Sequence, residues 1–312
     1  LCSTTILLMG GISVDRKDRR SVKRRGNFWV YELVFCGVIV AMFLLMKIVP
    51  FFLSIGYAFT DWNGISGVVT FNGVQNFIRL LGDTQFWYSL RFTLAQCLVA
   101  VISANLFGFF LAYFLVKPLK ARGLLRAGFY LPNVIGGLVL GFIWQFIFLK
   151  VFPAIGEVTG IGFFKLMWLG TPATAFWGLC IVQAWSFVGY YMLLYIAGFT
   201  ALPSDCLESA RVDGANARQT LFRIIVPLMR NTFTRCLFLS IVNSFKIYTV
   251  NMALTDGGPW GSSEGIAMNI YKTAFTENSM GYGSAKSLVF TTFVILFTAL
   301  QLYLTSKGEA DA

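Results

Sequence analysis

Long apolar blocks alternate with short polar connections along the 312-residue chain, and this alternation predicts its fold. A helix needs about 20 consecutive apolar residues to cross the hydrocarbon core of a bilayer. The blocks that reach this length are residues 33–58, 86–116, 127–149, 173–199, 232–254 and 286–305. Because backbone groups inside a bilayer must be hydrogen-bonded within the protein, we expect an all-α membrane protein with six transmembrane helices.

The composition agrees with a protein that lies mostly in lipid. Hydrophobic residues make up 57% of the chain and charged residues 12%, whereas about 25% of an ordinary soluble domain is charged. The chain contains no histidine, which excludes His-based catalytic triads, His-ligated metals and His proton relays. Its six cysteines show no metal-ligand spacing, so we interpret them as small apolar residues. We therefore expect no catalytic residue, no metal and no cofactor bound by this chain.

The net charge of +11 lies mainly in the connections between the apolar blocks, so it indicates topology rather than nucleic-acid binding. Seven Lys and Arg residues precede the first block, four lie around the second connection, five around the fourth and one after the sixth block. These 17 residues share one side of the membrane, and six lie on the other. Since cytoplasmic loops are enriched in Lys and Arg, the 17-residue side is predicted to be cytoplasmic, with both termini inside (N-in/C-in).

The chain divides into one membrane domain and two tails. Residues 1–32 form a predicted basic cytoplasmic tail, residues 33–306 the transmembrane domain, and residues 307–312 a second cytoplasmic tail. Residues 1–12 are apolar, but a segment of about a dozen residues cannot span a bilayer. The basic cluster follows this segment, whereas in a signal peptide it comes first, so we expect a disordered or membrane-surface tail.

Two short helices are predicted on the outer side. Residues 74–81 are amphipathic and suit a helix that lies flat on the membrane. The run Asp256-Gly257-Gly258-Pro259 is a strong chain break that ends the fifth block. Beyond it, apolar residues recur at helical spacing over residues 266–274, which predicts a short helix against the outer face.

The connection between the fourth and fifth blocks is long for a helical bundle, and residues 203–228 predict a helical hairpin. Pro203 ends the preceding helix, and Ser204 is a suitable N-cap for a short helix over residues 206–213. Gly214 then permits a sharp bend because it has no Cβ.

The second arm of the hairpin is predicted over residues 216–226. Leu221, Phe222 and Ile225 form its expected inner face, and Pro227 marks its end or a kink. Small residues and mixed charges on the outer side suit a socket on a soluble partner, and an ordinary structured loop is the alternative.

The order of residues in this hairpin resembles the EAA signature of the membrane-spanning subunits of ABC importers. The matching positions are Glu208, Ala210, Asp213, Gly214, Ala215, Phe222, Ile225 and Pro227. Ser209 stands where the family usually has alanine, but it is also small. In that family the motif forms a cytoplasmic helix-turn-helix, the coupling helix, which sits in a groove of the ATPase subunit. The residues implied to form the ATPase-coupling site are Glu208, Ser209, Ala210, Asp213, Gly214, Ala215 and Pro227.

The resemblance covers residues 30–305 and is closest to carbohydrate-uptake permeases. Phe86-Trp87, Leu131-Pro132 and Trp185 look like positions of that family. The run Leu-Thr-Asp-Gly-Gly-Pro after the fifth block is similar to the sugar and glycerol-phosphate branch, and to the MalF-like half of a permease pair.

The resemblance implies a type I ABC importer permease fold in the bacterial cytoplasmic (inner) membrane. Its implied partners are a second, homologous permease subunit, two ATPase subunits and an extracytoplasmic substrate-binding protein, with a sugar or oligosaccharide as cargo. The chain has no G-x-x-x-x-G-K-[ST] phosphate-binding loop. It is therefore predicted to be a non-catalytic subunit, and ATP and Mg are used by the ATPase partners.

Polar and aromatic side chains inside the spans mark a candidate cargo pathway, because buried polar groups are costly in a membrane. In the fifth block the candidates are Asn243, Lys246, Tyr248 and Asn251. In the fourth block they are Gln183, Trp185 and Tyr190. Amides hydrogen-bond sugar hydroxyls and aromatic rings stack on sugar rings, but aromatic residues at helical spacing also serve as packing.

Lys246 leaves two interpretations open. Related permeases often carry Gln, Glu or Asp in this stretch, so Lys246 and Thr249 depart from the family pattern. A lysine here suits an acidic sugar or a carboxylate partner. Equally, it pairs with a partner subunit or extends its ammonium group to the membrane surface.

Rival functions fit the sequence less well. A stand-alone secondary carrier would be expected to have inverted repeats and intramembrane carboxylates, but the predicted spans contain no Asp or Glu. A membrane enzyme would lack residues for general acid–base chemistry. Glycerol-phosphate or another polar solute is the alternative cargo within the same family.

Overall fold

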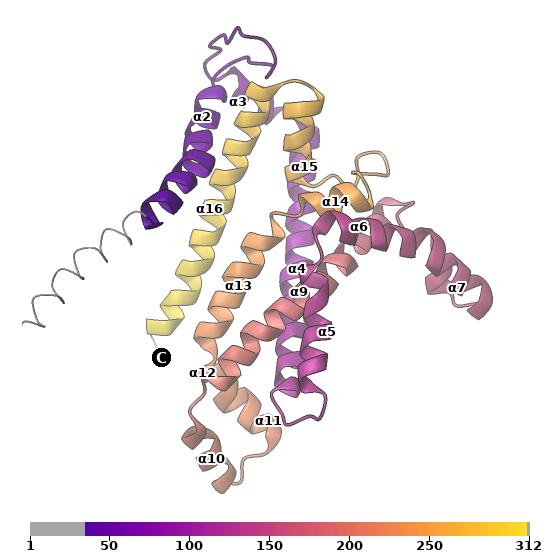
Figure 1. The fold of residues 1–312 in the computed structure, drawn as a ribbon, viewed down its shortest axis with the longest axis vertical. Helices are drawn as coiled ribbons and strands as arrows, with labels where there is room; N and C mark the ends of the chain where they lie inside the picture. Colours follow the sequence, from indigo (N-terminus) through magenta and orange to yellow (C-terminus); the bar gives the residue numbers. More distant parts are fainter. Residues whose placement is uncertain (1–34, 311–312) are drawn as a thin grey trace, which may run out of the picture. The chain divides into compact units, whose positions relative to one another are not determined.

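The computed structural model describes residues 35–310 and is built almost entirely of helices (Figure 1). In this part of the chain, the β-type pairing consists of an isolated antiparallel bridge between Thr60 and Phe71. The described residues divide into two compact units, residues 35–54 and 55–310. The predicted basic tail over residues 1–32 and its apolar start lie outside the described residues, as do residues 311–312.

The described part of the first unit is helical. It belongs to the 23-residue helix Phe35–Tyr57, which includes the π-helical turn η1 (Leu44–Ile48) and ends as α2 (Val49–Tyr57). Its side chains are mostly exposed and apolar. Its length and hydropathy suffice to cross a membrane, as predicted for the first block.

The second unit holds the remaining helices. In chain order they are α3 (Gln75–Leu81), α4 (Thr84–Leu115), α5 (Arg122–Val134), α6 (Gly137–Phe146), η2 (Ile147–Val151), α7 (Phe152–Thr159), α8 (Gly162–Lys165), α9 (Pro172–Thr200), α10 (Ser204–Val212), α11 (Ala217–Gln219), η3 (Thr220–Ile225), α12 (Val226–Leu228), α13 (Arg230–Ser244), α14 (Tyr248–Leu254), α15 (Ile266–Tyr271), η4 (Lys272–Thr276) and α16 (Met280–Ala310).

Among the described residues, five helices are long and apolar enough to cross a membrane. A sixth results if Ala217–Leu228 and Arg230–Ser244, which meet at a 69° bend, count as one span. The predicted all-α membrane fold is therefore confirmed. α4, α9 and α16 correspond to the second, fourth and sixth apolar blocks, and α3 and α15 to the two short outer helices.

Helices α4, α9 and α5 approach one another closely at two glycines. Gly108 of α4 faces Tyr191 and Met192 of α9, where an added Cβ would lie 3.1 Å from Met192 N. Gly189 of α9 lies against the backbone of Phe129 in α5, too close for any side chain. Small residues at such positions let helices pack backbone to backbone in a membrane protein.

The third predicted span was wrong as one continuous helix over residues 127–149. α5 ends at Val134, Ile135 and Gly136 are extended, and a new helix begins at Gly137. Two adjacent glycines weaken the helix, because glycine loses more backbone freedom than other residues on becoming helical. The apolar segment instead continues through α6, η2 and α7 as far as Thr159.

The fifth predicted span was also wrong as a single helix. α13 ends at Ser244, α14 begins at Tyr248, and residues 245–247 form a break. Before the break, the Ser244 hydroxyl donates to Ser240 O (2.7 Å), so a side chain shares the backbone acceptor. Lys246 N then donates to Asn243 O, three residues back, and the helical ladder stops there.

A buried ion pair ties together the helices at the α15 end of the second unit. Lys286 of α16 is 3% exposed, and its ammonium group lies 2.8 Å from the Asp83 carboxylate. The same ammonium donates to Asn269 Oδ1 and Thr273 Oγ1 of α15 and η4. Asp83 in turn caps α4 by accepting from the backbone N–H of Phe86 (2.9 Å). One cation thus joins α4, α15, η4 and α16.

The Asp83 carboxyl is stabilised in its charged form. Burial acts to raise its pKa, but hydrogen bonds from Lys286, Tyr282 and the Phe86 backbone outweigh burial and hold the pKa below its usual range. Because this pKa is lower in the folded state, the stabilisation is present at neutral pH and is lost only as the pH falls through the lowered value.

We expect Lys286→Met to lower the free energy of unfolding by about 3 kcal/mol, because it leaves a partly buried carboxylate without its cation. Thermal or denaturant unfolding of the purified protein in detergent measures this loss. Lys272→Met is the comparison, since the Lys272 side chain is 33% exposed whereas that of Lys286 is 4% exposed, so water already shares its contact with Glu264 and we expect a smaller loss. Equal losses for the two variants would contradict the assignment.

Candidate functional site

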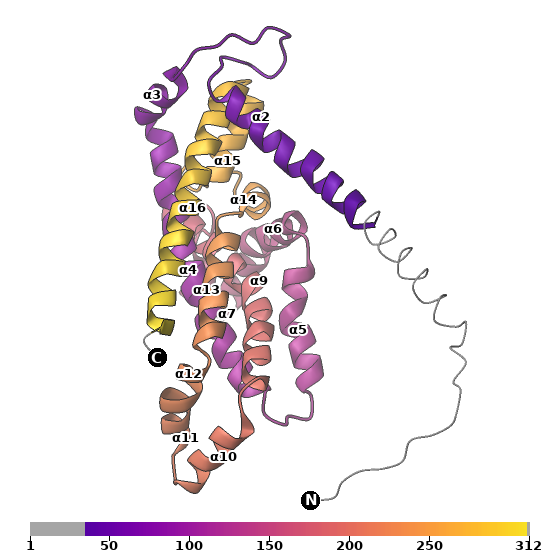
Figure 2. The same ribbon diagram turned by 90° about the vertical axis from the view of Figure 1, so that its left-hand side faces the viewer.

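A helical hairpin joins α9 to α13 and lies at the opposite end of the second unit from α15 (Figures 1 and 2). Its first arm is α10 (Ser204–Val212), and Gly214 turns the chain with φ of +74°, a left-handed conformation suited to glycine. Asn216 and Gln219 then cap the second arm reciprocally, with two 2.9 Å hydrogen bonds between side chain and backbone. The predicted two-arm hairpin with a bend at Gly214 is confirmed.

The seven predicted coupling residues all lie on this hairpin. Glu208, Ser209, Asp213, Gly214 and Pro227 are exposed, Ala215 is half-buried and Ala210 is buried. The exposed members are accessible to a partner, and the small buried members let the arms pack closely. Contact with an ATPase remains a prediction.

Phe222 does not belong to the inner face of the hairpin, contrary to the sequence prediction. Leu221 and Ile225 are buried as predicted, whereas Phe222 is 58% exposed. Residues four apart share one face of a helix, and the next residue along is turned away by about 100°. Together with Val212, which is 87% exposed, Phe222 gives the hairpin an apolar outer surface.

The inner face of the hairpin is part of the core of the second unit. Leu221, Ile225 and Met229 belong to one buried cluster with Phe109 of α4 and Tyr195 of α9. A movement of the hairpin therefore acts directly on the packed centre of the helix bundle.

A pocket of about 220 Å³ lies where α9 passes the two helix breaks. Its polar lining consists of Asn133, Gln183, Ser186, Asn243, Lys246 and Thr249. Gln183, Asn243 and Lys246 were predicted as pathway residues, and the structure brings these three together. The polar lining combines amides and hydroxyls with one cationic side chain.

Gln183 supplies an unpaired amide to this pocket. Its side chain is 2% exposed, and neither its amide nitrogen nor its amide oxygen has a hydrogen-bond partner among the described residues. A buried amide without partners is costly, about 1–3 kcal/mol, and is rare in folded proteins. Both amide atoms are almost fully covered, so a molecule in the pocket can hydrogen-bond the amide once a neighbouring side chain moves.

Asn243 and Lys246 stand on either side of the end of α13. Asn243 Nδ2 donates to the Tyr191 hydroxyl (3.3 Å), which links the pocket to the buried core cluster. Lys246 lies in the break and is exposed, and no carboxylate in the described part of the chain pairs with it. No group of three or more Cys, Asp or Glu residues that could hold a metal occurs among the described residues either.

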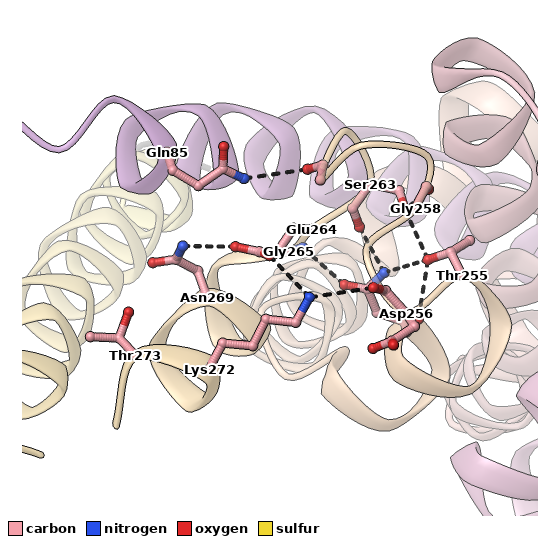
Figure 3. A network of polar contacts seen from close by, with 12 residues as sticks. Gln85, Thr255, Asp256, Gly258, Ser263, Glu264, Gly265, Asn269, Lys272 and Thr273 are labelled. Carbon is pink, nitrogen blue, oxygen red and sulfur yellow. Dashed lines mark hydrogen bonds and ion pairs between the residues drawn. The ribbon is translucent and has the colours of Figure 1, made fainter. Parts of the chain in front are cut away.

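Asn251 does not line the pocket, and its side chain is fully hydrogen-bonded within the chain. It is fully buried, and its amide donates to Ser263 O (2.7 Å) and Thr255 Oγ1 (3.0 Å). Its oxygen accepts from Gly265 N (2.9 Å). These bonds hold the loop between α14 and α15, which Figure 3 shows from close by.

The aromatic candidates are also outside the pocket lining. Tyr248 packs against Tyr271, with ring centroids 5.1 Å apart, and Trp185 packs edge-on against Trp144 at 5.5 Å. Tyr190 lies beside Tyr191 in an edge-to-face arrangement. The structure therefore gives these rings packing partners within the chain.

Three of the polar pocket residues were not among the sequence predictions. Ser186 follows Gln183 by one helical turn on α9, and this spacing was a usable signal. Thr249 and Asn133 gave no such signal, because they face the pocket only where α5 and α13 are interrupted.

Several membrane-spanning helices, a polar pocket at two helix breaks and an exposed hairpin together define the membrane-spanning subunit of a transporter. Residues 104–307 match the family described as "Binding-protein-dependent transport system inner membrane component", and the chain belongs to that family. It is therefore a multi-pass membrane permease.

The chain is similar to curated permease proteins along most of its length. It is 39% identical to the probable starch degradation products transport system permease protein AmyD of Thermoanaerobacterium thermosulfurigenes, over 92% of this chain and 97% of the relative. It is 29% identical to the multiple sugar-binding transport system permease protein MsmF of Streptococcus mutans, over 83% of this chain and 90% of the relative.

The fold is similar to that of a solved bacterial ABC transporter involved in the import of the acidic polysaccharide alginate. The TM-score is 0.76 at 18% sequence identity, over 92% of this chain and 99% of that one. A second structure of a bacterial alginate ABC transporter, in complex with an alginate pentasaccharide-bound periplasmic protein, matches with a TM-score of 0.75 at 17% identity, over 92% of this chain and 96% of that one. These matches confirm the predicted ABC importer permease fold.

We expect Asn251→Ala to lower the free energy of unfolding by about 1–3 kcal/mol, because buried groups at Ser263 and Gly265 lose their partner. Asn243→Ala removes one long hydrogen bond at the pocket and should cost less stability. Unfolding in detergent compares the two variants. If Asn243→Ala proved the more destabilising, the structural assignment of Asn251 would be wrong.

Proposed function

We propose that this chain is the membrane-spanning subunit through which an ATP-driven importer moves a sugar or oligosaccharide into the cell. In this proposal it pairs with a second, homologous permease subunit and binds two ATPase subunits through its hairpin. An extracytoplasmic binding protein delivers the cargo. The chain itself catalyses no bond chemistry, and the ATPase partners use ATP and Mg.

The sugar cargo is supported by the relatives of the chain and by the chemistry of the pocket. The names of the relatives AmyD and MsmF refer to the transport of starch degradation products and of multiple sugars. Sugar hydroxyl groups are both donors and acceptors, and so are the amide and hydroxyl side chains that line the pocket. Glycerol-phosphate and other polar solutes are the alternative within the family.

The observation that carries the proposal is the unpaired amide of Gln183 in the pocket. In the apolar interior of a membrane protein, such a group favours a bound polar molecule over an empty cavity. Asn243 and Lys246 lie in the same lining, so a sugar bound to Gln183 would also meet an amide and a cation. The cation would in addition attract an acidic sugar.

Coupling to ATP hydrolysis follows from where the hairpin packs. Its exposed side carries Glu208, Val212 and Phe222, which offer charge and apolar area to an ATPase. Its inner side shares a core cluster with α4 and α9. When the ATPase subunits close on ATP, the hairpin would move with them and tilt these helices, so that the pocket is exposed alternately to the two sides.

We expect Gln183→Leu to raise the KM for sugar uptake about tenfold, because the cargo loses one or two hydrogen bonds in a buried site. Uptake by the whole transporter in proteoliposomes, with neutral and acidic oligosaccharides, gives this value. The variant should fold as well as the parent, since the Gln183 amide has no partner in the described chain.

Gln96→Leu is the matched control for this experiment. Gln96 of α4 is also buried, and its amide also lacks partners among the described residues, but it does not line the pocket. Its substitution should leave the KM unchanged. An unchanged KM for Gln183→Leu, or an equal change of KM in both variants, would show that the pocket is not part of the cargo pathway.

We expect Gly214→Pro to abolish sugar-dependent ATP hydrolysis while the protein still inserts in the membrane. Proline fixes φ near −65°, whereas Gly214 has φ of +74°, so the turn of the hairpin cannot form. ATPase activity of the reconstituted transporter, with and without cargo-loaded binding protein, measures the loss.

Gly160→Pro controls for the backbone strain of this change. Gly160 also has φ of +74° and, like Gly214, open space around its missing side chain, but it lies after α7, outside the hairpin. It should keep sugar-dependent hydrolysis. The coupling role would fail if Gly214→Pro retained normal uptake and stimulated hydrolysis.

A further inference from the structure

The loop of residues 255–265, between α14 and α15, is held from two sides. From α4, Gln85 Nε2 donates to Gly261 O (3.3 Å), and the Tyr88 hydroxyl donates to Ser262 O (3.0 Å). Figure 3 shows the Gln85 side chain pointing toward the loop. From α14, Asn251 binds the backbone further along the same loop. The second half of the loop is thus attached to α4 and α14.

Charged side chains attach the loop to α15 and η4 as well (Figure 3). Glu264 is 7% exposed and lies 3.2 Å from the Lys272 ammonium group. Asn269 donates to the other oxygen of Glu264 (2.7 Å), and Lys272 also reaches Asp256 O (3.4 Å). The backbone position of the loop is therefore fixed at both of its ends.

Trp260 projects from this fixed loop into open surroundings. Its side chain is 91% exposed, the highest value among the exposed large hydrophobic residues in the described part of the chain. Its φ is +50°, a left-handed conformation that bulky residues rarely adopt. Such a conformation persists where the surrounding structure imposes it, and residues of this kind cluster at functional sites.

The residues around Trp260 are polar, which indicates that its indole faces water and not lipid. The loop lies on the extracytoplasmic side by the distribution of Lys and Arg, and it carries the exposed carboxylate of Asp256. Gln85, which is also exposed, binds the residue next to Trp260. A tryptophan that anchors a protein in the interface needs no fixed backbone, whereas a preorganised tryptophan is typical of a protein–protein contact.

The loop also follows directly on a helix that lines the polar pocket. Thr249 and Val250 line the pocket, and α14, which carries them, ends at Leu254, directly before the loop. A protein that delivers cargo to the pocket from outside would dock on the side of the membrane where this loop lies.

We propose that Trp260 is a docking contact for the extracytoplasmic binding protein, whose surface buries the indole when it delivers its sugar. This inference rests on the proposed function, because it requires that a binding protein serves this transporter. The fixed loop lowers the entropy lost on docking, and the indole supplies a large apolar contact.

The test compares Trp260→Gly with Asn278→Gly in the complete reconstituted transporter. Glycine suits a positive φ, so the loop should keep its conformation without the indole. Asn278 has the same φ of +50° and is exposed, but it offers no aromatic ring, which makes it the matched control. The apparent Kd of the transporter's own purified binding protein is measured by ATPase stimulation with maltotriose, and by direct binding without sugar.

Trp260→Gly should raise the apparent Kd at least tenfold, both with and without maltotriose, and Asn278→Gly should leave it unchanged. An unchanged Kd for Trp260→Gly would overturn the proposal. A loss seen only with maltotriose would also overturn it, since Trp260 would then contact the sugar and not the protein.

Failure of this inference is distinguishable from failure of the proposed function. If the binding protein stimulates the parent transporter and Trp260→Gly equally, only the docking contact is wrong. If neither maltotriose nor any other sugar stimulates the parent transporter with its binding protein, the proposed function itself is wrong.

Discussion

The structure depends on one constraint, that every backbone N–H and C=O group inside a bilayer must find a partner. A membrane helix can therefore break only where other parts of the protein or a polar cavity cover the break. This chain has breaks after α5 and after α13, and they meet, because Gly137 lies against Thr249 with no room for a side chain. The polar pocket lies at this meeting point, so the interruption that disturbs the helices also creates the candidate cargo site.

The pocket and the hairpin are connected through packed side chains. Asn243 at the pocket donates to the Tyr191 hydroxyl, and Tyr191 belongs to the same buried cluster as Leu221 and Ile225 of the hairpin. Gly108 lets α4 pack tightly against Tyr191. Closely packed interiors move as units, so displacement of the hairpin should reach the pocket through α9.

The sequence predicted best those features that depend on local chemistry. Apolar length located the spans at α4 and α9, and a glycine after the first arm of the hairpin located the turn at Gly214. The EAA resemblance placed the predicted coupling residues on that hairpin, and their contact with an ATPase stays a prediction. Within the pocket, Gln183 and Lys246 were predicted because polar groups are costly in a span.

The features that the sequence did not predict depend on tertiary contacts. Hydropathy is the same for a continuous and a broken apolar segment, so the breaks at Ile135 and Phe245 could not be located. The cost of polar groups in a span placed Asn251 with Asn243 among the pathway candidates, but Asn251 lies beyond the break and bonds the α14–α15 loop. Phe222 is apolar yet exposed, and only packing of the hairpin against the core distinguishes it from Leu221.

The most direct test of the central claim is a structure of the complete transporter, with its ATPase subunits and binding protein, trapped with a bound oligosaccharide. We expect a sugar hydroxyl within about 3 Å of the Gln183 amide, in the pocket at the two helix breaks. Sugar density elsewhere in the membrane domain, with this pocket empty, would contradict the proposal that the broken helices form the cargo site.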